Sequence, residues 1–399
     1  MHVLLVDDDH SKIERLKLFL IDQGIDENDI LIATDAADAS RNLKKNKIDL
    51  MLIDVLLPAR NGAKPKADSS INLLRQIVED EILPTPTHIL GVTASEETRN
   101  KVDSQFKELV TNVLHVSADQ DNWKVVLQQY VQRLLRTEKE NTSFIYDVVV
   151  LNALRKPELE AVYNSWPLEL SDEKLVGSNI NCKTGYLKLS SDKTLKIACA
   201  HLNQMGPIAA THSTEVVLKH FKPRVIIMTG ICGGFSDAVS VGDVVIAEKS
   251  WDWQSGKWVD DWSLQAASDP KEGSNELISL AKTIDVDMQS FYQQYTGYRP
   301  ANHPKLITAP MVSGSSVVAS ADIQKVFRGQ HRKMAAIDME CYGLYYSCAN
   351  HHGQPTKMVC IKSVSDLADR EKDDNYQSYC SFISARVALR LIEKYFKLI

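Results

Sequence analysis

The chain has 399 residues, which is enough for two or three domains. Its hydrophobic share of 44% and charged share of 25% are those of a globular protein, and its net charge of −6 excludes a general attraction to nucleic acid or acidic membranes. No apolar run approaches the ~20 residues that span a bilayer, and the start lacks a signal-peptide pattern. The seven cysteines form no CxxC pair. We therefore expect a cytoplasmic protein with reduced thiols and no nucleic-acid or membrane partner.

Strands and helices alternate over residues 1–137. Short apolar runs predict strands, and apolar residues at helical spacing predict helices. The predicted strands are 3–6, 49–57 and 88–93, and the predicted helices begin near Ile13 and cover 71–78 and 122–136. This alternation is typical of a parallel sheet with helices on both faces. The polar stretch that follows predicts a linker, which we place at 138–145.

The pattern then restarts and defines a second α/β domain over residues 146–399. Its predicted strands are 147–154, 224–229, 241–248 and 357–364, with a glycine-rich turn at 230–234 and a final helix at 377–397. At about 255 residues this part is large for one domain but within range. The chain shows no internal repeat and no low-complexity tract.

Polar side chains stand at three predicted strand ends of the first domain. Asp7 and Asp8 end the first strand, Asp54 ends the second, and Thr93 ends the third. Ligands of parallel sheets bind outside the carboxyl ends of the strands. Clustered carboxylates repel one another unless a cation intervenes, and Mg²⁺ accepts such oxygens. Asp54 could then attack a phosphoryl donor while Thr93 holds the new phosphate, although each acid taken alone reads more readily as a surface cap.

These residues resemble the response-regulator receiver family, whose motifs match VDDD, DLMLIDVLLP and GVTA. The resemblance implies a flavodoxin-like domain over residues 1–137, Mg²⁺ at Asp7, Asp8 and Asp54, and phosphorylation of Asp54 by a histidine kinase or phosphotransfer partner. It also makes Thr93 the switch residue. The family usually carries Lys followed by Pro about 22 residues after this threonine, and here His115 and a valine take that place. A neutral histidine pairs less well with phosphate, so we expect an altered activation geometry.

Four segments of the second domain carry candidate chemistry. TGICGGF at 229–235 follows a strand, and its glycines could expose N–H groups to an anion or sugar, although a plain tight turn explains them equally well. AIDMECYGLYY at 336–346 offers Glu340, which could accept two hydrogen bonds from a diol or merely begin a helix. CIKSVSDLAD at 360–369 brings Ser365 and Asp366 to a strand end, and LNALRKPELEAV at 151–162 contains Glu158.

In order and spacing, these segments resemble the nucleoside phosphorylase and nucleosidase superfamily, particularly the nucleosidases that use water. The resemblance implies that Asp366 protonates the purine at N7 and that Ser365 orients it. Glu340 would bind the ribose hydroxyls, Met339 would pack on the sugar, and Glu158 would position or deprotonate water, as in two-carboxylate glycosidases. Further substrate contacts are expected at Ile231, Gly233, Gly234, Val318 and Arg155. No cofactor is expected for the cleavage itself.

The match has departures. The loop ALRKPE is one residue longer than the family's usual form, and Asp338 replaces a more usual Glu before Met339. In the purine-pocket segment 317–324, Ala321 and Gln324 replace the Gly and Phe that methylthioadenosine nucleosidases usually carry. We therefore expect a different base pocket and a substrate other than methylthioadenosine.

A receiver fused to a nucleosidase resembles the Detocs-like effectors of phage-defence two-component systems. The resemblance implies release of adenine from ATP by a homo-oligomeric enzyme. The basic residues that could hold a triphosphate are Arg155, Lys156, His201, His212 and Lys362. Two alternatives remain open: a regulated methylthioadenosine or S-adenosylhomocysteine nucleosidase, and a non-catalytic regulator that binds nucleosides.

Overall fold

The structure is a computed structural model that describes residues 1–80, 82–95, 97, 106, 108–109, 113–116, 122–177, 179–260, 263–368 and 375–399. The chain divides into two compact units, Met1–Asn141 and Thr142–Ile399. None of the described helices is long and apolar enough to cross a membrane.

The first unit is a parallel sheet with helices on both faces. Its elements are β1 (Val3–Val6), α1 (His10–Asp22), η1 (Glu27–Asp29), β2 (Ile30–Ala33), α2 (Ala36–Lys45), β3 (Leu50–Asp54), α3 (Ala67–Val78), β4 (His88–Thr93), β5 (Val113–His115) and α5 (Asn122–Thr142). The strand order is β2-β1-β3-β4-β5, with every pair parallel. This order is that of flavodoxin-like folds, and it confirms the predicted fold of this half.

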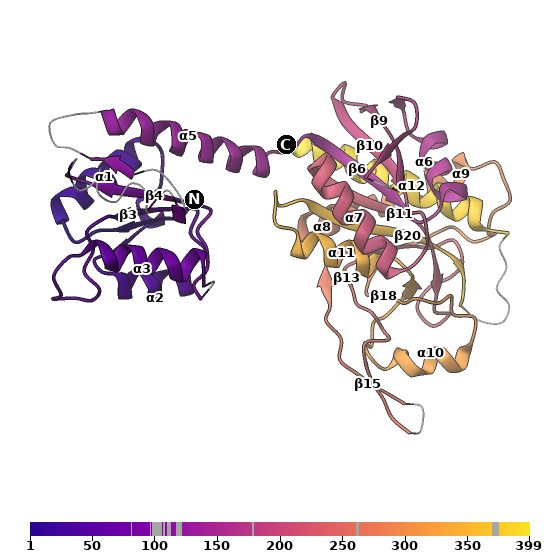
Figure 1. Cartoon of the computed structure of the whole chain (residues 1–399). Helices are drawn as coiled ribbons and strands as arrows, with labels where there is room; N and C mark the ends of the chain where they lie inside the picture. Colours follow the sequence, from indigo (N-terminus) through magenta and orange to yellow (C-terminus); the bar gives the residue numbers. More distant parts are fainter. Residues whose placement is uncertain are drawn as a thin grey trace. The chain divides into compact units, whose positions relative to one another are not determined.

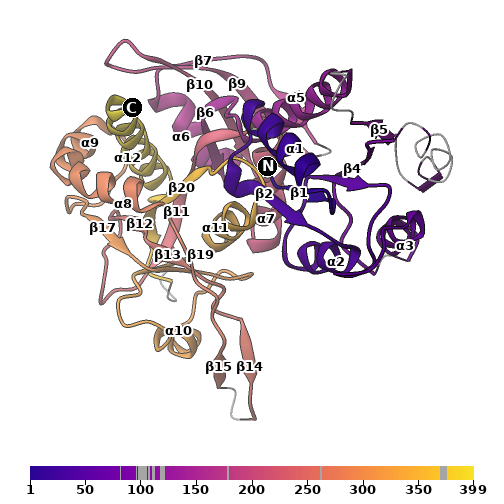
Figure 2. The same ribbon diagram turned by 90° about the vertical axis from the view of Figure 1, so that its left-hand side faces the viewer.

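Both faces of this sheet are buried, which explains why its strands are continuous apolar runs. Figure 2 shows α1 and α5 on one side of the sheet and α2 and α3 on the other. Leu16 of α1 and Leu127 of α5 belong to one core cluster, and Leu43 of α2 and Leu74 of α3 belong to the other. The predicted strands 3–6 and 88–93 and the predicted helices of this half are confirmed, whereas the strand predicted at 49–57 was too long, because β3 ends at Asp54.

Helix α5 continues to Thr142, so most of the polar stretch expected as a linker is helical. The stretch contains glutamate and lysine, which are strong helix formers, and neither glycine nor proline. Nothing in it therefore stops the helix that precedes it.

The second unit is built on a larger mixed sheet. Its helical elements are η2 (Arg155–Leu159), α6 (Glu160–Ser165), α7 (Pro207–Phe221), α8 (Asn275–Ala281), η3 (Lys282–Asp287), α9 (Met288–Gln294), α10 (Ala321–Arg328), α11 (Cys341–Asn350) and α12 (Gln377–Leu398). Its main strands are β6 (Tyr146–Asn152), β7 (Leu168–Leu170), β8 (Lys174–Val176), β9 (Ile180–Lys188), β10 (Thr194–His201), β11 (Pro223–Gly234), β12 (Val244–Ala247), β17 (Leu306–Ala309), β18 (Met311–Ser313), β19 (Ala336–Asp338) and β20 (Lys357–Asp366). Two small ribbons pair β13 (Lys249–Ser250) with β16 (Lys271–Glu272) and β14 (Gly256–Trp258) with β15 (Leu264–Ala266).

The order of the main strands is β17-β12-β20-β11-β6-β10-β9-β7, with β19 on β11, β18 on β19 and β8 on β9. The strands β20, β11, β6 and β10 are parallel neighbours, so the ends of segments far apart in sequence lie side by side. Helices cover both faces: α12 lies with α6, α8 and α9 on one core cluster, and α7 lies beside α11 on the other (Figure 1).

The glycine-rich segment expected as a turn at 230–234 is instead the last part of β11. It pairs with β20 on one side and with β19 on the other, and its register against β20 shifts between Cys232 and Gly233. Strand pairing on both sides keeps this backbone extended, so the prediction of a turn was wrong.

Candidate active site

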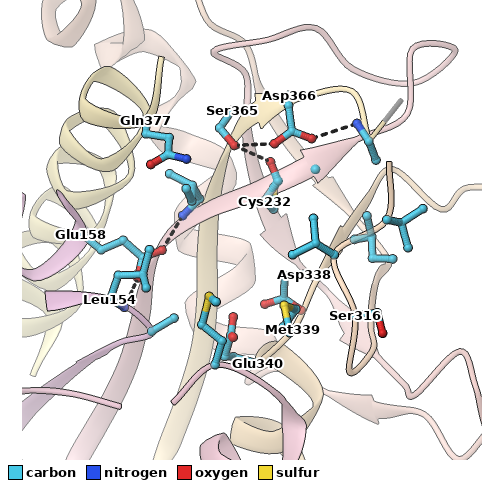
Figure 3. A pocket seen from close by; sticks show the side chains of 18 residues that line it. Leu154, Glu158, Cys232, Ser316, Asp338, Met339, Glu340, Ser365, Asp366 and Gln377 are labelled. Carbon is cyan, nitrogen blue, oxygen red and sulfur yellow. Dashed lines mark hydrogen bonds between the residues drawn. The ribbon is translucent and has the colours of Figure 1, made fainter. Parts of the chain in front are cut away.

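A cavity of about 300 Å³ opens where β6, β11 and β20 end. Its lining residues are Ala153, Leu154, Glu158, Met205, Ile231, Cys232, Gly233, Ser316, Val317, Val318, Ile337, Asp338, Met339, Glu340, Ser365, Asp366, Ala368 and Gln377. In Figure 3, Asp366 and Ser365 lie at one end of this cavity, Met339 and Glu340 lie at the other, and Glu158 lies at its side. The cavity therefore collects carboxylates from three separate segments of an otherwise largely apolar wall.

Asp366 ends β20, and both of its carboxylate oxygens accept hydrogen bonds. The Ser365 hydroxyl lies 3.0 Å from Oδ2, and the Ala368 backbone N–H donates to Oδ1 at 2.9 Å. The same hydroxyl lies 3.3 Å from the Cys232 carbonyl oxygen. A hydroxyl donates one proton, so Ser365 can turn to that carbonyl and accept a proton from Asp366 instead. The pair can accommodate either protonation state of Asp366.

Glu158 is buried in the short helical turn η2 after β6. Its Oε2 accepts from the Leu154 N–H at 2.8 Å, and its Oε1 accepts from the Ile231 N–H at 2.9 Å. A Cβ at Gly230 would lie 2.0 Å from Oε1. Gly230, the first glycine of TGICGG, therefore makes room for the carboxylate of Glu158. The sequence pattern did not reveal this role.

Asp338 is the last residue of β19, and Glu340 directly precedes α11. Glu340 Oε1 accepts from the Gly206 N–H at 3.1 Å. Asp338 accepts from the Ser313 hydroxyl at 2.6 Å and from the N–H of Cys341, the first residue of α11, at 2.9 Å. Asp338 thus fixes the backbone that presents Glu340 to the cavity.

The side chain of Lys362 has no exposed surface, and it lies behind these carboxylates. Its ammonium is 3.6 Å from Glu340 Oε2, 3.8 Å from Glu158 Oε1 and 3.9 Å from Asp338 Oδ2. Burial lowers the pKa of Lys362, but the charges of Glu158, Glu340 and Asp338 raise it by more, to above its ordinary value. The lysine remains a cation inside the protein and offsets the charge of the carboxylates.

Burial also raises the pKa of two of the carboxyl groups, those of Glu158 and Asp338. It raises the pKa of Glu158, and the Glu340 charge adds to this, while the Lys362 charge opposes it. Burial raises the pKa of Asp338 to about 6, again against the charge of Lys362. Displaced values of this kind are frequent where carboxyl groups take part in proton transfer.

Eight of the predicted residues of this domain line the cavity: Glu158, Ile231, Gly233, Val318, Met339, Glu340, Ser365 and Asp366. Gly234 and Arg155 do not. Gly234 packs against Val239 and Val364 with no room for a Cβ, and Arg155 pairs with Glu173. Lys362, considered for a phosphate, is not on the surface at all, so that expectation was wrong.

Sequence reasoning missed several lining residues. Met205 comes from the loop before α7, and Gln377 comes from the start of α12. Gln324 of the predicted purine-pocket segment donates to the backbone oxygens of Leu367 and Ala368, and so joins α10 to the segment after Asp366. A single residue of a loop, such as Met205, or of a helix, such as Gln377, carries no local signal for such a position.

A second cavity of about 700 Å³ shares Met205 with the first. It lies at the amino end of α7 and is lined by Asn179, Asn203, Gln204, Met205, Gly206, Pro207, Ile208, Ala209, His212, Ser213 and Ser315. The first turn of a helix presents backbone N–H groups that lack intrahelical partners, and the positive end of the helix dipole; in α7 the Gly206 N–H donates to Glu340 and Pro207 has no N–H, so this turn contributes the N–H groups that follow them. The lining adds amide, hydroxyl and imidazole groups, of which His212 is the one basic residue that the sequence had also suggested.

The receiver unit holds a separate acidic cluster. One carboxylate oxygen from each of Asp7, Asp8 and Asp54 lies within 4.8 Å of the others, which fits a hard divalent cation such as Mg²⁺. Burial and then the charge of Asp7 raise the pKa of Asp54 to about 7, while Lys12 lowers it. Thr93 is buried at the end of β4, beside the end of β3. His115 ends β5, and its Nε2 lies 3.0 Å from the Ala94 carbonyl oxygen.

Family models match both units. The model for the phosphorylase superfamily matches residues 149–397, and the model for the response regulator receiver domain matches residues 3–115. The protein y4jS of Sinorhizobium fredii is 31% identical over 412 residues, and the match covers 99% of each chain.

Other relatives match about half of the chain. The ATP nucleosidase Cap17 of Escherichia coli is 22% identical over 209 residues, which span 49% of this chain and 41% of Cap17. A 5'-methylthioadenosine/S-adenosylhomocysteine nucleosidase of Bacillus licheniformis is 25% identical over 48% of this chain and 78% of its own length. The crystal structure of a mutant of the Helicobacter pylori enzyme MTAN, with 5'-methylthioadenosine in its active site, has a TM-score of 0.51 at 18% identity, and covers 62% of this chain and 99% of that one. This likeness confirms the predicted fold of the second half.

Proposed function

The chain belongs to the phosphorylase superfamily and contains a receiver domain, and from this premise we propose that it is a phosphorylation-regulated nucleosidase that cleaves adenine nucleotides, with ATP as the main substrate. The observation that carries the proposal is the meeting of Asp366, Glu158 and Glu340 in one cavity. An acid for the leaving base, a group for the water and a partner for the sugar hydroxyls are the three functions that N-glycoside hydrolysis requires.

Asp366 acts on the leaving base. As the bond between the sugar C1′ and the purine N9 breaks, its electron pair moves into the purine ring. A protonated Asp366 donates its proton to N7, and the base leaves as neutral adenine. The hydroxyl of Ser365 serves both states, since it can accept from the acid and donate to the carboxylate.

Glu158 and Glu340 act on the water and the sugar. A water oxygen adds to C1′ while Glu158 takes one of its protons, so that Asp366 loses a proton and Glu158 gains one in each turnover. The N–H groups of Leu154 and Ile231 hold Glu158 in position for this step. Glu340 accepts hydrogen bonds from the ribose hydroxyls, with Met339 packed beside the sugar.

The second cavity supports a nucleotide substrate rather than a nucleoside. It adjoins the Glu340 end of the first cavity, where Gly206 donates to Glu340 and Met205 lines both spaces. A phosphate chain on the sugar would find N–H groups of the α7 start, together with His212 and Ser213. Arg155 and Lys156 form ion pairs with Glu173 and Glu160 instead, and neither lines the first or the second cavity.

The similarity to the ATP nucleosidase Cap17 supports the same substrate. An enzyme that destroys ATP must be kept inactive until it is needed, and a receiver domain supplies such control. We therefore propose an antiphage role in which a kinase that senses infection phosphorylates Asp54 and starts the loss of ATP. Two-component regulation has less purpose for a constant salvage step.

Chromatography of the reaction products tests the proposal. The full-length protein, treated with a phosphodonor and Mg²⁺, is incubated with ATP, AMP, adenosine and methylthioadenosine in phosphate-free buffer. Adenine should appear fastest from ATP, with ribose 5′-triphosphate as the other product. Faster consumption of methylthioadenosine or S-adenosylhomocysteine would make the chain a regulated salvage nucleosidase, and no release of adenine from any substrate would leave only nucleoside binding.

A further inference from the structure

We propose that Lys12, on helix α1, is the cation that binds the phosphoryl group on Asp54. The inference concerns the receiver unit alone, and it holds whichever substrate the second unit cleaves. It rests on three observations: the position of Lys12 among the acids, the orientation of His115, and the charge of the cluster.

Lys12 is buried at the edge where β1 and β3 end. Its ammonium lies 2.8 Å from Asp7 Oδ2 and 3.0 Å from Asp54 Oδ2, and its side chain is 5% exposed. Asp9 fixes the start of α1, because its carboxylate accepts from the backbone N–H groups of Ser11 and Lys12. Side chains of a helix point back toward its amino end. Lys12 is therefore held over the carboxyl end of the sheet.

His115 is turned to a different partner. Its Nε2 is 3.0 Å from the carbonyl oxygen of Ala94. A carbonyl oxygen only accepts, so this nitrogen carries the proton and donates it there. Among the residues that the structure describes, Lys12 is the only cation that forms an ion pair with Asp54. A phosphoryl group formed on Asp54 would thus meet Lys12 first.

The charges favour this arrangement. Asp7, Asp8 and Asp54 carry three negative charges when ionised, and Lys12 reduces the sum to two, which one Mg²⁺ balances. Lysine and metal can therefore act together, since Lys12 pairs with one oxygen of Asp7 and one of Asp54 while a carboxylate oxygen of Asp8 remains for the metal. Mg²⁺, when bound, shields the charge of the incoming phosphoryl group.

The step itself is a group transfer. A carboxylate oxygen of Asp54 forms a bond to the phosphorus of an acyl phosphate or a phosphohistidine. The bond from phosphorus to the donor oxygen or nitrogen breaks, and the donor leaves with its electron pair. The aspartyl phosphate carries more negative charge than the carboxylate did. Lys12 can move from Asp7 to a phosphoryl oxygen and offset that gain without leaving the site.

The test compares full-length variants treated with acetyl phosphate and Mg²⁺, with the phosphorylated fraction followed by intact mass. Lys12→Met should slow phosphorylation at least tenfold, and Lys12→Arg should keep part of the rate. Lys17→Met is the matched control, because Lys17 lies on the same helix and pairs with Glu27 at 2.7 Å; it should behave as wild type. A Lys12→Met protein that phosphorylates at the wild-type rate would overturn the proposal.

Variants of His115 separate the two candidate cations. His115→Ala should change the rate less than threefold, whereas Lys12→Met combined with His115→Lys should recover part of the lost rate by supplying an ammonium from β5. Thermal shifts with beryllium fluoride and Mg²⁺ give a second readout: wild type and Lys17→Met should be stabilised and Lys12→Met should not. Loss of phosphorylation in His115→Ala, with Lys12→Arg and Lys12→Met both active, would assign the role to His115. If Lys12→Met fails to fold, the phosphorylation rates of Lys12→Arg and His115→Ala are compared instead, and this comparison decides which of the two residues is the cation.

Discussion

The ammonium of Lys362 lies 3.6 Å from Oε2 of Glu340, inside the second unit and without any exposed surface. Glu158 and Asp338 complete a ring of three carboxylates around it. Among the residues that the structure describes, the ammonium has no hydrogen-bond partner, so its contacts are those of charge. The group proposed to act on water and the group proposed to hold ribose therefore share one buried counter-ion.

Replacing Lys362 by methionine should destabilise the second unit strongly. The change leaves three buried carboxylates without a cation, and breaking a buried pair from one side costs about 3–5 kcal/mol. The loss should shrink as pH falls, because protonation removes the excess negative charge. Urea unfolding of the second unit at pH 7 and pH 5 measures both effects. Lys357→Met, on the same strand but in a partly exposed pair with Glu276, should change stability by less than about 1 kcal/mol; similar losses in the two variants would contradict the argument.

Asp366→Asn should lower turnover of ATP by about 10²-fold or more, since an amide cannot donate the proton that the leaving purine needs. Asn is nearly the same shape and can still accept from Ala368, so the fold should survive. Steady-state rates of adenine release give the answer. Asp322→Asn changes an exposed acid on α10 and should leave the rate unaltered. An Asp366→Asn enzyme with most of its activity would remove Asp366 from the mechanism.

Glu158→Gln should also reduce turnover by about 10²-fold, because the amide cannot take a proton from water. In the wild type, burial raises the pKa of Glu158 above its ordinary value of 4.5, so the base becomes protonated, and inactive, at a higher pH than a free glutamate would. As pH falls, kcat/KM should therefore decline well before pH 4.5 is reached.

The pH profile of kcat/KM between pH 4.5 and 8 measures this decline. Since Glu158 and Asp338 share Lys362, the apparent pKa belongs to this pair of carboxyl groups. Glu160→Gln, at an exposed pair with Lys156, is the control and should keep the wild-type profile. A profile that stays flat down to pH 4.5 would contradict the role given to Glu158.

Phosphorylation of Asp54 should raise nucleosidase activity. The new phosphate must rearrange the neighbourhood of Thr93, and such a local change can bias a two-state domain. Turnover is measured with and without acetyl phosphate and Mg²⁺, in wild type and in Asp54→Ala. Only the wild type with phosphodonor should be fast. Equal rates under all four conditions would mean that the receiver does not regulate the enzyme.

His212→Ala should raise KM for ATP by about tenfold, which corresponds to the loss of one charge-assisted hydrogen bond. KM for adenosine should stay unchanged. The reason is that His212 lines the second cavity, where the phosphate chain is proposed to lie. Lys156→Ala removes an exposed cation that lines neither cavity and should alter neither value. If Lys156→Ala weakens ATP binding and His212→Ala does not, the phosphates lie elsewhere.

Local patterns in the sequence predicted the elements and several of the residues that meet. VLLV followed by acids, and LMLID ending in Asp54, predict parallel strands, and the carboxyl ends of parallel strands share one edge of the sheet. The same reasoning brought Ser365 and Asp366 to a strand end. These predictions succeeded because a buried strand and its first polar residue are both written in a few consecutive letters.

Other features depend on contacts that no short segment encodes. TGICGG reads as a turn, but pairing with β19 and β20 makes it a strand, and Gly230 is needed because Glu158 lies against it. In the sequence, Lys362 reads as a cation that is available to a ligand. A strand that is buried on both faces shows no alternation of polar and apolar residues, so the pattern does not mark Lys362 as buried.

Lys12 likewise reads as one polar residue of a helix, until α1 sets its ammonium between two carboxylates. By itself the sequence determined two α/β domains and the carboxylates at their strand ends. Only the tertiary structure decided which cations face those carboxylates, because strand order and helix packing join residues that are more than a hundred positions apart in the second unit, and the charge of a buried group depends on every neighbour that the fold brings to it.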